Sequence, residues 1–502
     1  MAATRLHLRN LYADLDTSMA ALNADHSRVS DSRKVVEQAL TSGKAHYGIN
    51  TGFGILANKR ISTPELSKLQ RNILLSHACG VGDPVPHKIS KLMLQLKIHS
   101  LGLGFSGISN QTFAQLRAYN SADLIARIPS QGSVGASGDL APLAHMCLPL
   151  IGCGEVWNQK QDGFLPAAER MDELGLTAVE LSAKDGLALI NGTQLMLAYG
   201  SYCVERALKL CKAADILASM SLEALQGSAA PYDARVHAVR PHKGQIQVAA
   251  NVRALLKDSE IMDSHRNCGK VQDPYSLRCV PQVHGASRDA FDAIVNTLEV
   301  ELNSVTDNPL VFPDGDIISG GNFHGQPLAL SLDYAAIALA ELASISERRC
   351  YLLLEGHDGL PTLLMSDTGV NSGFMIPQYT AAALVSENKI LCHPASVDSI
   401  PTSLGQEDHV SMGSISALKL LSVLKNVERV LAVELLCAAQ ALDFRRPIKP
   451  GKGVDAAYRF LRERINHAEE DYEVRNDLDI CAEILRSGEL VSVVEQAITD
   501  FS

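Results

Sequence analysis

The sequence has 502 residues, of which 46% are hydrophobic and 20% are charged, so it can bury a large core without disulfides or a metal ion. The formal net charge of -11 disfavours binding to nucleic acid or to an anionic membrane, which leaves a small molecule as the expected partner. The 11 cysteines are scattered without a CxxC pair, which predicts reduced thiols in a cytoplasmic protein. The first residues, MAATRLHLRN, contain no apolar signal region, and no long apolar run predicts a membrane span.

The chain is expected to contain three regions in succession. Residues 1–200 alternate short apolar segments with glycine-rich turns, which predicts a loop-rich helical N-terminal region. Residues 201–443 repeat apolar side chains at helical spacing over many turns, which predicts a central bundle of long helices. Residues 444–502 are more charged and amphipathic, and we expect peripheral helices there. The predicted fold is therefore all-α.

Two segments of the expected bundle are apolar around most of their circumference. These segments are residues 332–356 and 414–444. A helix of this kind is stable in water only when other helices or a second subunit surround it. The sequence therefore predicts a buried bundle and an oligomer.

The most unusual stretch is GSVGASGDLAPLAH, residues 132–145. A phosphate-binding loop would need a Lys-Ser or Lys-Thr pair where Asp139 and Leu140 stand. A nucleophile elbow around Ser137 would need a glycine where Asp139 stands. The histidines and cysteines show no HExxH or CxxC grouping, so no metal site is expected. A plain turn remains the ordinary explanation of an isolated glycine-serine loop.

A third interpretation of this loop is chemical. The amide nitrogen of Gly138 can attack the carbonyl carbon of Ala136 and close a five-membered ring, because the small neighbours permit the necessary bend. Loss of water from the ring and from the Ser137 side chain would leave a methylidene conjugated to carbonyl groups. Such a group is an electrophile that no ordinary side chain supplies.

Several long motifs occur in an order that identifies a resemblance. The chain resembles the aromatic amino acid ammonia-lyases, whose prosthetic group is 4-methylideneimidazole-5-one, roughly from Tyr47 to Gly413. The motifs that carry the resemblance are YGINTGFG, GSVGASGDLAP, INGTQ, VQDPYSLRC, TDNPL, GGNFHG and NSGFM…HPASVDSIPTSLGQEDHVSMG. The resemblance implies a nearly all-helical enzyme that acts on an amino acid, needs no metal or nucleotide, and forms a homotetramer with shared active sites.

The resemblance also implies catalytic roles for particular residues. Ala136, Ser137 and Gly138 would form the prosthetic group, to which the substrate amine adds and so becomes a better leaving group. Tyr47 would then remove the β-proton, which requires helix N-termini to lower its pKa from the usual value of about 10. Tyr275 would share proton handling or orient the amine.

Further matching residues are expected to bind the substrate. Arg278 would bind its carboxylate, for which a bidentate guanidinium is well suited. Amide side chains are expected to bind the substrate carboxylate or the ring carbonyl of the prosthetic group, and these are Asn191, Gln272 and Asn322. Phe323 is expected to pack beside the ring. Asp139 is expected either to polarise the Gly138 amide during cyclisation or to cap the following helix.

The substrate side chain is predicted from three positions. In the family, the pair Ser76-His77, a glutamate at Glu407 and a methionine at Met375 accompany an imidazole substrate, and a carboxylate suits an imidazole N–H. The expected reaction is therefore elimination of ammonia from histidine. A tyrosine ammonia-lyase stays open, because His77 could also bind a phenol. An aromatic aminomutase stays open, because the aminomutases share the prosthetic group and the motifs. A non-catalytic structural homologue is a rival of another class, disfavoured because every catalytic position is present.

Overall fold

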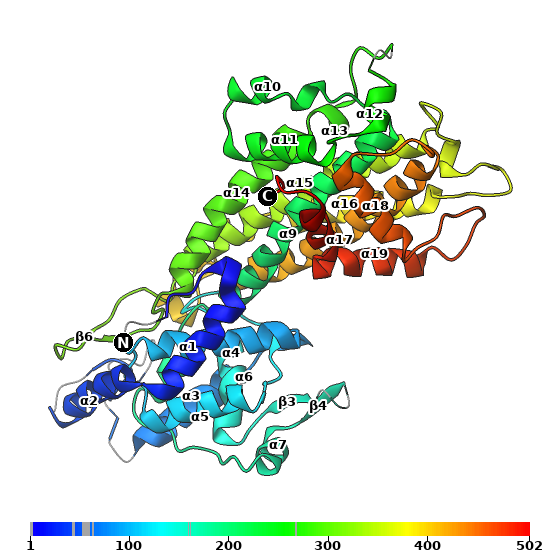
Figure 1. The fold of residues 1–502 in the computed structure, drawn as a ribbon. Coiled ribbons are helices and arrows are strands. Elements are labelled where there is room, and N and C mark those ends of the chain that lie inside the picture. The colour runs from blue at the N-terminus through cyan, green and yellow to red at the C-terminus, as the bar shows by residue number, and fades with distance from the viewer. Residues whose placement is uncertain are drawn as a thin grey trace. The chain divides into compact units, whose positions relative to one another are not determined.

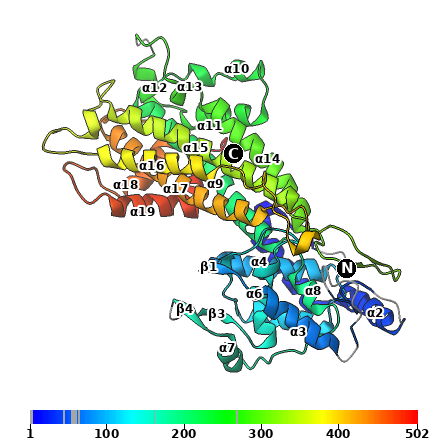
Figure 2. The ribbon, with the colours of Figure 1, turned by 180° about the vertical axis from the view of Figure 1, so that it is seen from behind.

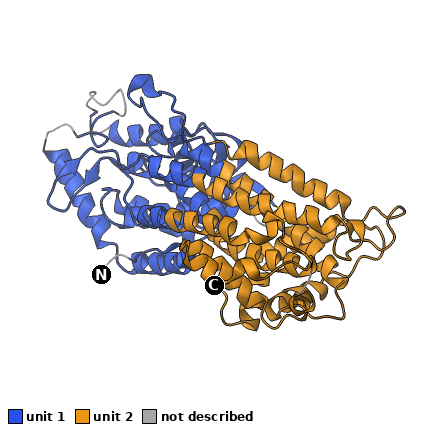
Figure 3. Cartoon of the chain, turned by 90° about the horizontal axis from the view of Figure 1, so that it is seen from above, with its two compact units in different colours: residues 1–202, 295–333, 394–418 blue, residues 203–294, 334–393, 419–502 orange. Residues whose placement is uncertain are grey.

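The computed structural model describes residues 4–42, 46–52, 61–62, 65–158, 160, 162–266 and 269–502. Helices dominate it (Figure 1), so the predicted all-α class is confirmed. The chain divides into two compact units, each composed of three separate segments (Figure 3). Unit 1 comprises residues 1–202, 295–333 and 394–418, and unit 2 comprises residues 203–294, 334–393 and 419–502.

Unit 1 has its own helical core. Helices α3, α6 and α8 pack against one another, and α4 packs against α1 and α5. Almost every residue of α4 after its first turn is buried, which fits its run of leucine, methionine and isoleucine. The helices that lie wholly in this unit are α1 (Leu11–Ala24), α2 (Ser27–Thr41), α3 (Leu66–His77), α4 (His87–Gly102), α5 (Asn110–Ser121), α6 (Leu140–Cys147), α7 (Ala167–Glu173) and α8 (Asp185–Ile190).

Three short antiparallel strand pairs in unit 1 were not predicted from the sequence. They are β1 (Val81–Pro84) with β2 (Pro129–Gln131), β3 (Glu155–Asn158) with β4 (Gly163–Pro166), and β5 (Leu310–Val311) with β6 (Ile317–Ile318). In the second pair Trp157 lies opposite Phe164, with ring centroids 4.6 Å apart. Such a cross-strand aromatic pair stabilises a short hairpin.

Four of the five points at which the chain passes from one unit to the other lie in long helices. These helices are α9 (Gln194–Ala224), α14 (Val280–Leu302), α15 (Gln326–Leu354) and α17 (Gly413–Asp443), and the predicted apolar segments 332–356 and 414–444 lie almost wholly in α15 and α17. Helix α9 begins before residue 201, and Gly200 lies inside it. A Cβ there would lie 2.7 Å from Leu332, so the glycine allows close packing between helices.

Unit 2 is a bundle in which α15, α16 and α17 lie side by side (Figures 1 and 2). Gln378 of α16 donates a hydrogen bond to Glu347 of α15, and Asn426 of α17 donates one to Asn388 of α16. The helices that lie wholly in this unit are α10 (Ala234–Ala238), α11 (Lys243–Leu255), α12 (Glu260–Ser264), α13 (Tyr275–Arg278), α16 (Met375–Leu391), α18 (Lys452–Arg462), α19 (Arg475–Ser487) and α20 (Glu489–Ala497). Helix α15 is long and apolar enough to cross a membrane, but 61% of its most apolar window is buried, as in a core helix.

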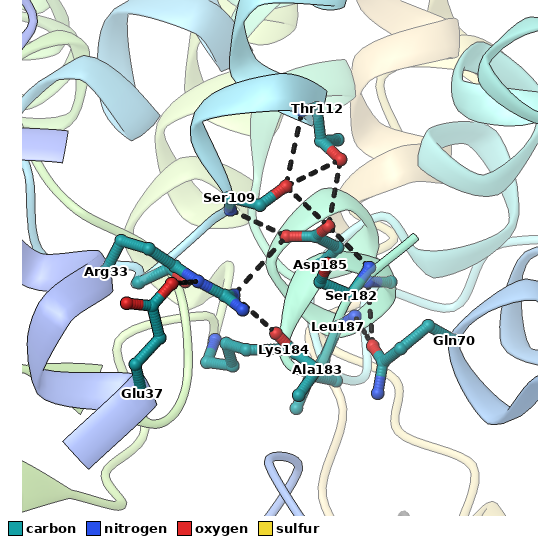
Figure 4. A network of polar contacts seen from close by, with 12 residues as sticks. Arg33, Glu37, Gln70, Ser109, Thr112, Ser182, Ala183, Lys184, Asp185 and Leu187 are labelled. Carbon is teal, nitrogen blue, oxygen red and sulfur yellow. Dashed lines mark hydrogen bonds and ion pairs between the residues drawn. The ribbon is translucent and has the colours of Figure 1, made fainter. Parts of the chain in front are cut away.

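A buried polar network fixes the position of α8 in unit 1 (Figure 4). The Asp185 carboxylate is fully buried and accepts hydrogen bonds from Ser109 N at 2.7 Å, Thr112 Oγ1 at 2.8 Å and Ser182 N at 2.8 Å. Gln70 of α3 accepts a bond from Gly186 N at 2.8 Å, in the first turn of α8. Burial raises the pKa of Asp185, which these hydrogen bonds partly offset. The network holds the helix that leads into residues 190–194.

Replacement of Asp185 by alanine is expected to lower the free energy of unfolding by about 3 kcal/mol, because the buried Ser109 and Thr112 hydroxyls lose their shared acceptor. Urea unfolding followed by circular dichroism would measure the change. Asp172→Ala, at an exposed position of α7, is the control and should shift the unfolding free energy by less than about 0.5 kcal/mol. Equal midpoints for Asp185→Ala and the unchanged chain would contradict the role of the network.

Candidate functional site

The loop that contains Ala136-Ser137-Gly138 lies in unit 1, between β2 and α6. Gly138 has a φ of +76°, and a Cβ at this position would lie 2.0 Å from Gly192 O. Both the backbone conformation and the close contact therefore require glycine at position 138. Ala136 is buried and Ser137 is half-buried.

Residues 190–194, the sequence INGTQ between α8 and α9, lie against this loop and are called the strap below. Asp139 N donates a hydrogen bond to Gly192 O at 2.7 Å, and Gly192 N donates one to Ser137 O at 3.4 Å. Among the described residues, neither Gly138 N nor Ala136 O has a hydrogen-bond partner. The two groups that cyclisation would join are therefore not engaged elsewhere.

A second segment, residues 394–418, holds the other side of the loop. Ser411 Oγ donates a hydrogen bond to Gly135 O at 3.1 Å, and Met412 N donates one to Val134 O at 2.9 Å. Ala136 also packs in a small apolar cluster with Val410 and Met412. The loop is thus held between two segments that are distant in sequence.

Asp139 is fully buried beside the loop, and its carboxylate stabilises a helix other than the one predicted. It accepts hydrogen bonds from Leu195 N at 2.8 Å and Met196 N at 3.1 Å, in the first turn of α9. It also accepts a bond from Ser414 Oγ at 3.0 Å. Its side chain makes no capping bond to α6, so the prediction that it caps the following helix is wrong. Burial raises the pKa of Asp139 to about 7.

The predicted substrate-specificity residues Ser76, His77 and Glu407 line one cavity of about 230 Å³ together with Ala136 and Gly138. Ser137 Oγ donates a hydrogen bond to Glu407 Oε1 at 3.0 Å. The other carboxylate oxygen, Oε2, accepts a bond from Thr402 Oγ1 at 2.8 Å. A carboxylate is therefore fixed beside the serine of the loop.

His77 is the last residue of α3, and its Nδ1 lies 3.0 Å from Ser76 Oγ. Burial lowers the pKa of His77, and the nearby Glu407 carboxylate opposes that shift. The net effect favours the neutral imidazole, which can both donate and accept one hydrogen bond.

The remaining predicted residues of unit 1 have distinct surroundings. Tyr47 is half-buried and precedes Gly48, where a Cβ would lie 2.2 Å from Leu187 of α8. Asn191 is buried in the strap, and its Nδ2 donates to Asn308 O at 2.8 Å. Asn322 and Phe323 lie between β6 and α15. Asn322 is exposed and donates a hydrogen bond to Val305 O at 3.3 Å, and Phe323 is half-buried.

The other predicted residues belong to unit 2. Tyr275 and Arg278 are the ends of α13, and the Arg278 guanidinium lies 4.5 Å from the centroid of the Tyr275 ring. Arg278 Nε is buried and has no hydrogen-bond partner in the described part of the chain, which leaves a donor for an anion. Arg278 and Gln272 line a cavity of about 360 Å³. Met375 is the first residue of α16 and is half-buried.

The comparisons with known proteins identify the family of this chain. The family model described as aromatic amino acid lyase matches residues 8–463. The chain belongs to the aromatic amino acid lyase family. It is therefore a carbon–nitrogen lyase, and the resemblance inferred from the motifs is confirmed.

Individual relatives of this lyase are similar over nearly the whole chain. A histidine ammonia-lyase of Myxococcus xanthus is 50% identical over 94% of this chain and 93% of its own length. The crystal structure of histidine ammonia-lyase from Trypanosoma cruzi is 42% identical, with a TM-score of 0.88, and the match covers 95% of this chain and 90% of that one. Tyrosine aminomutase from Streptomyces globisporus is 35% identical, with a TM-score of 0.89 and coverage of 94% and 93%.

Sequence reasoning missed several residues of this lyase that hold the loop in place. Thr402 fixes the Glu407 carboxylate, Ser414 contacts Asp139, and Lys97 of α4 contacts the strap. Lys97 had a detectable signal, because it is a lone lysine between the apolar residues of LMLQLKIHSLG. Thr402 and Ser414 had none, because their partners lie far away in sequence.

Proposed function

We propose that this lyase eliminates ammonia from L-histidine to give trans-urocanate, the first step of histidine degradation. The observation that carries the proposal is that Ser76, His77 and Glu407 line one cavity with Ala136 and Gly138. A neutral imidazole and a carboxylate are complementary to the imidazole ring of the substrate. The names and the identities of the curated relatives support the same substrate.

The Ala136-Ser137-Gly138 segment fits an autocatalytically formed 4-methylideneimidazole-5-one. The close contact at Gly138 and the unengaged Gly138 N and Ala136 O support this assignment. When formed, the group supplies an electrophile for the substrate amine. Among the described residues, no three His, Cys, Asp or Glu side chains gather in a way that could hold a metal ion.

We assign the following tasks to the side chains. Glu407 accepts the imidazole N–H of the substrate, and Arg278 binds its carboxylate through the unpaired Nε. Tyr47 removes the β-proton, while Tyr275 handles a proton or orients the amine. The residues that contribute amide hydrogen bonds or apolar contacts are Asn191, Gln272, Asn322, Phe323 and Met375.

The lyase is further proposed to be a cytoplasmic homotetramer with active sites that combine residues of more than one subunit. Exposed apolar side chains on two helices support association: on α15 Leu330, Tyr334 and Ile337, and on α16 Ile376, Tyr379 and Ile390. The division into regions 1–200, 201–443 and 444–502 stays a prediction.

Incubation of the purified protein with histidine, tyrosine and phenylalanine tests the substrate. We expect histidine to have the highest kcat/KM, measured from the absorbance of the conjugated acrylate. Glu407→Gln should lower kcat/KM for histidine by about tenfold to a hundredfold, because a charged hydrogen bond is lost. Asp408→Asn, which changes the neighbouring exposed carboxylate, is the matched control and should have little effect.

A second candidate is a tyrosine ammonia-lyase or an aminomutase, favoured by the similarity to the Streptomyces globisporus enzyme and by the capacity of His77 to bind a phenol. Preferential turnover of tyrosine in the same assay would reject histidine as the substrate. Formation of a β-amino acid, detected by mass spectrometry, would identify an aminomutase. A protein that turns over none of these amino acids would support a non-catalytic homologue.

A further inference from the structure

Lys97 is a buried lysine of α4 with an unusual partner. Its side chain is 2% exposed, and Nζ donates a hydrogen bond of 2.5 Å to the backbone carbonyl of Asn191 in the strap. This is the only hydrogen bond of Lys97 Nζ within the described part of the chain. The nearby carboxylate of Asp307 is engaged by Lys184 Nζ at 2.7 Å. The ammonium group of Lys97 therefore contacts the peptide carbonyl of Asn191 and not a carboxylate.

That peptide group connects Lys97 to the loop. Asn191 C=O and Gly192 N–H belong to the same planar amide, and Gly192 N donates to Ser137 O at 3.4 Å. A cation on the carbonyl oxygen polarises the amide and strengthens its N–H as a donor. The distance of 3.4 Å is long for a neutral acceptor, and contacts of this kind shorten when charge develops on the oxygen. Lys97 can thus act on the Ser137 carbonyl through one peptide.

We propose that Lys97 is a positioning residue for the self-processing of Ala136-Ser137-Gly138, in which it polarises the Asn191–Gly192 peptide so that Gly192 N–H stabilises negative charge on Ser137 O. The proposal rests on the proposed function, since it requires the loop to cyclise. It adds a maturation role for a residue that does not touch the reacting atoms.

The step that Lys97 assists is the dehydration of Ser137. Water accepts the proton from Ser137 Cα, and the electron pair of that C–H bond delocalises onto Ser137 O as an enolate. The enolate then collapses, the Cα=Cβ double bond forms, and the Cβ–Oγ bond breaks. The departing hydroxyl takes a proton from water, so the net change is the loss of one water. The other water comes from the Ala136 carbonyl oxygen after Gly138 N has attacked the carbon. Preorganised donors aimed at a developing oxyanion accelerate such steps.

The charge of Lys97 depends on pH in an accessible range. Burial lowers the pKa of Lys97 to about 8. The charged or titratable groups that act on it are Asp307, Cys147 and Asp139, which favour the ammonium form, and Lys184, which opposes it. The ammonium form is present below this pKa and is lost as pH rises through it, so processing should slow above about pH 8.

The test follows processing in the full-length chain made by cell-free synthesis. After translation is stopped, samples are chased at about pH 7 and about pH 9, and intact mass reports the loss of two waters. We expect Lys97→Met to be processed about tenfold to a hundredfold more slowly than the unchanged chain at the lower pH. Lys97→Arg keeps its charge at both values and should be processed equally fast at each.

Met93→Ala is the matched control for lost stability, because Met93 is fully buried in the same helix but carries no charge. It should lower the melting temperature without slowing processing to the extent of Lys97→Met. Equal slowing by Met93→Ala would overturn the proposal, as would Lys97→Met processed at the normal rate. If Lys97→Met does not fold, the comparison of Lys97→Arg with the unchanged chain decides. The proposal would be overturned if processing of Lys97→Arg slowed between the two pH values as much as processing of the unchanged chain does. An unchanged chain that never loses water would reject the prosthetic group itself.

Discussion

Ser137→Ala should retain the mass of its unprocessed sequence and lose ammonia elimination by at least about a thousandfold. The alanine has no hydroxyl to lose, so the methylidene cannot form. We expect the fold to tolerate the change, because Ser137 is half-buried and, within the described residues, its hydroxyl makes one hydrogen bond, to Glu407. Intact-mass measurement and the histidine assay would check both parts.

Ser133→Ala is the control for the loss of a loop hydroxyl. Ser133 Oγ accepts a hydrogen bond from Gly135 N at 3.2 Å and lies 2.8 Å from Ser414 Oγ, but it lies outside the triad. We expect this variant to be processed and to keep most of its activity. A Ser137→Ala chain that still loses two waters, or that retains normal turnover, would contradict the assignment of Ser137.

Arg349→Met is expected to lower the free energy of unfolding by about 3–5 kcal/mol. Arg349 and Glu434 are both fully buried, and the guanidinium contacts the carboxylate through Nε at 2.5 Å and Nη2 at 2.7 Å. Removal of the arginine leaves a buried carboxylate for which Ser221 Oγ, at 2.7 Å, is the one remaining donor among the described residues. Arg349 Nη1 also lies 3.5 Å from Ser276 O in α13, so Arg278 should become less well placed. Urea unfolding would measure the loss.

The double variant Arg349→Met/Glu434→Leu separates the interaction from the burial cost. Because both charges are then absent, much of the lost stability should return, and a double-mutant cycle gives the coupling energy. Arg475→Met is the control, because its side chain and that of its ion partner Asp479 are both largely exposed. A double variant less stable than Arg349→Met would contradict the view that the unpaired carboxylate causes the loss.

The sequence was sufficient to predict the family and to propose a chemistry for the loop, but not to predict the surroundings of the loop. The need for small residues at Ala136 and Gly138 follows from the bond to be formed, and the motif order revealed the family. The partners of the loop could not be predicted from local patterns. Glu407 meets Ser137 across 270 residues of sequence, and Asp139 stabilises the start of α9, not the helix it precedes.

The fold was predictable where periodicity is strong and uninterrupted. The segments 332–356 and 414–444 lie in α15 and α17, because their apolar residues repeat over many turns. The hairpin of β3 and β4 escaped prediction, since its strands have only four residues each and depend on the Trp157–Phe164 pair. The position of Gly200 inside α9 was not predictable, because the glycine permits a close contact with Leu332 that the local sequence does not reveal.

The contacts of the loop with residues 394–418 impose an order on biosynthesis. Gly135 and Ser137 are held by Ser411 and Glu407, which a ribosome makes long after the loop itself. A nascent chain that does not yet contain Glu407 and Ser411 lacks the hydrogen bonds that hold one side of the triad. These contacts therefore form only late in translation, so the proposed cyclisation of the triad should follow the synthesis and folding of residues 394–418.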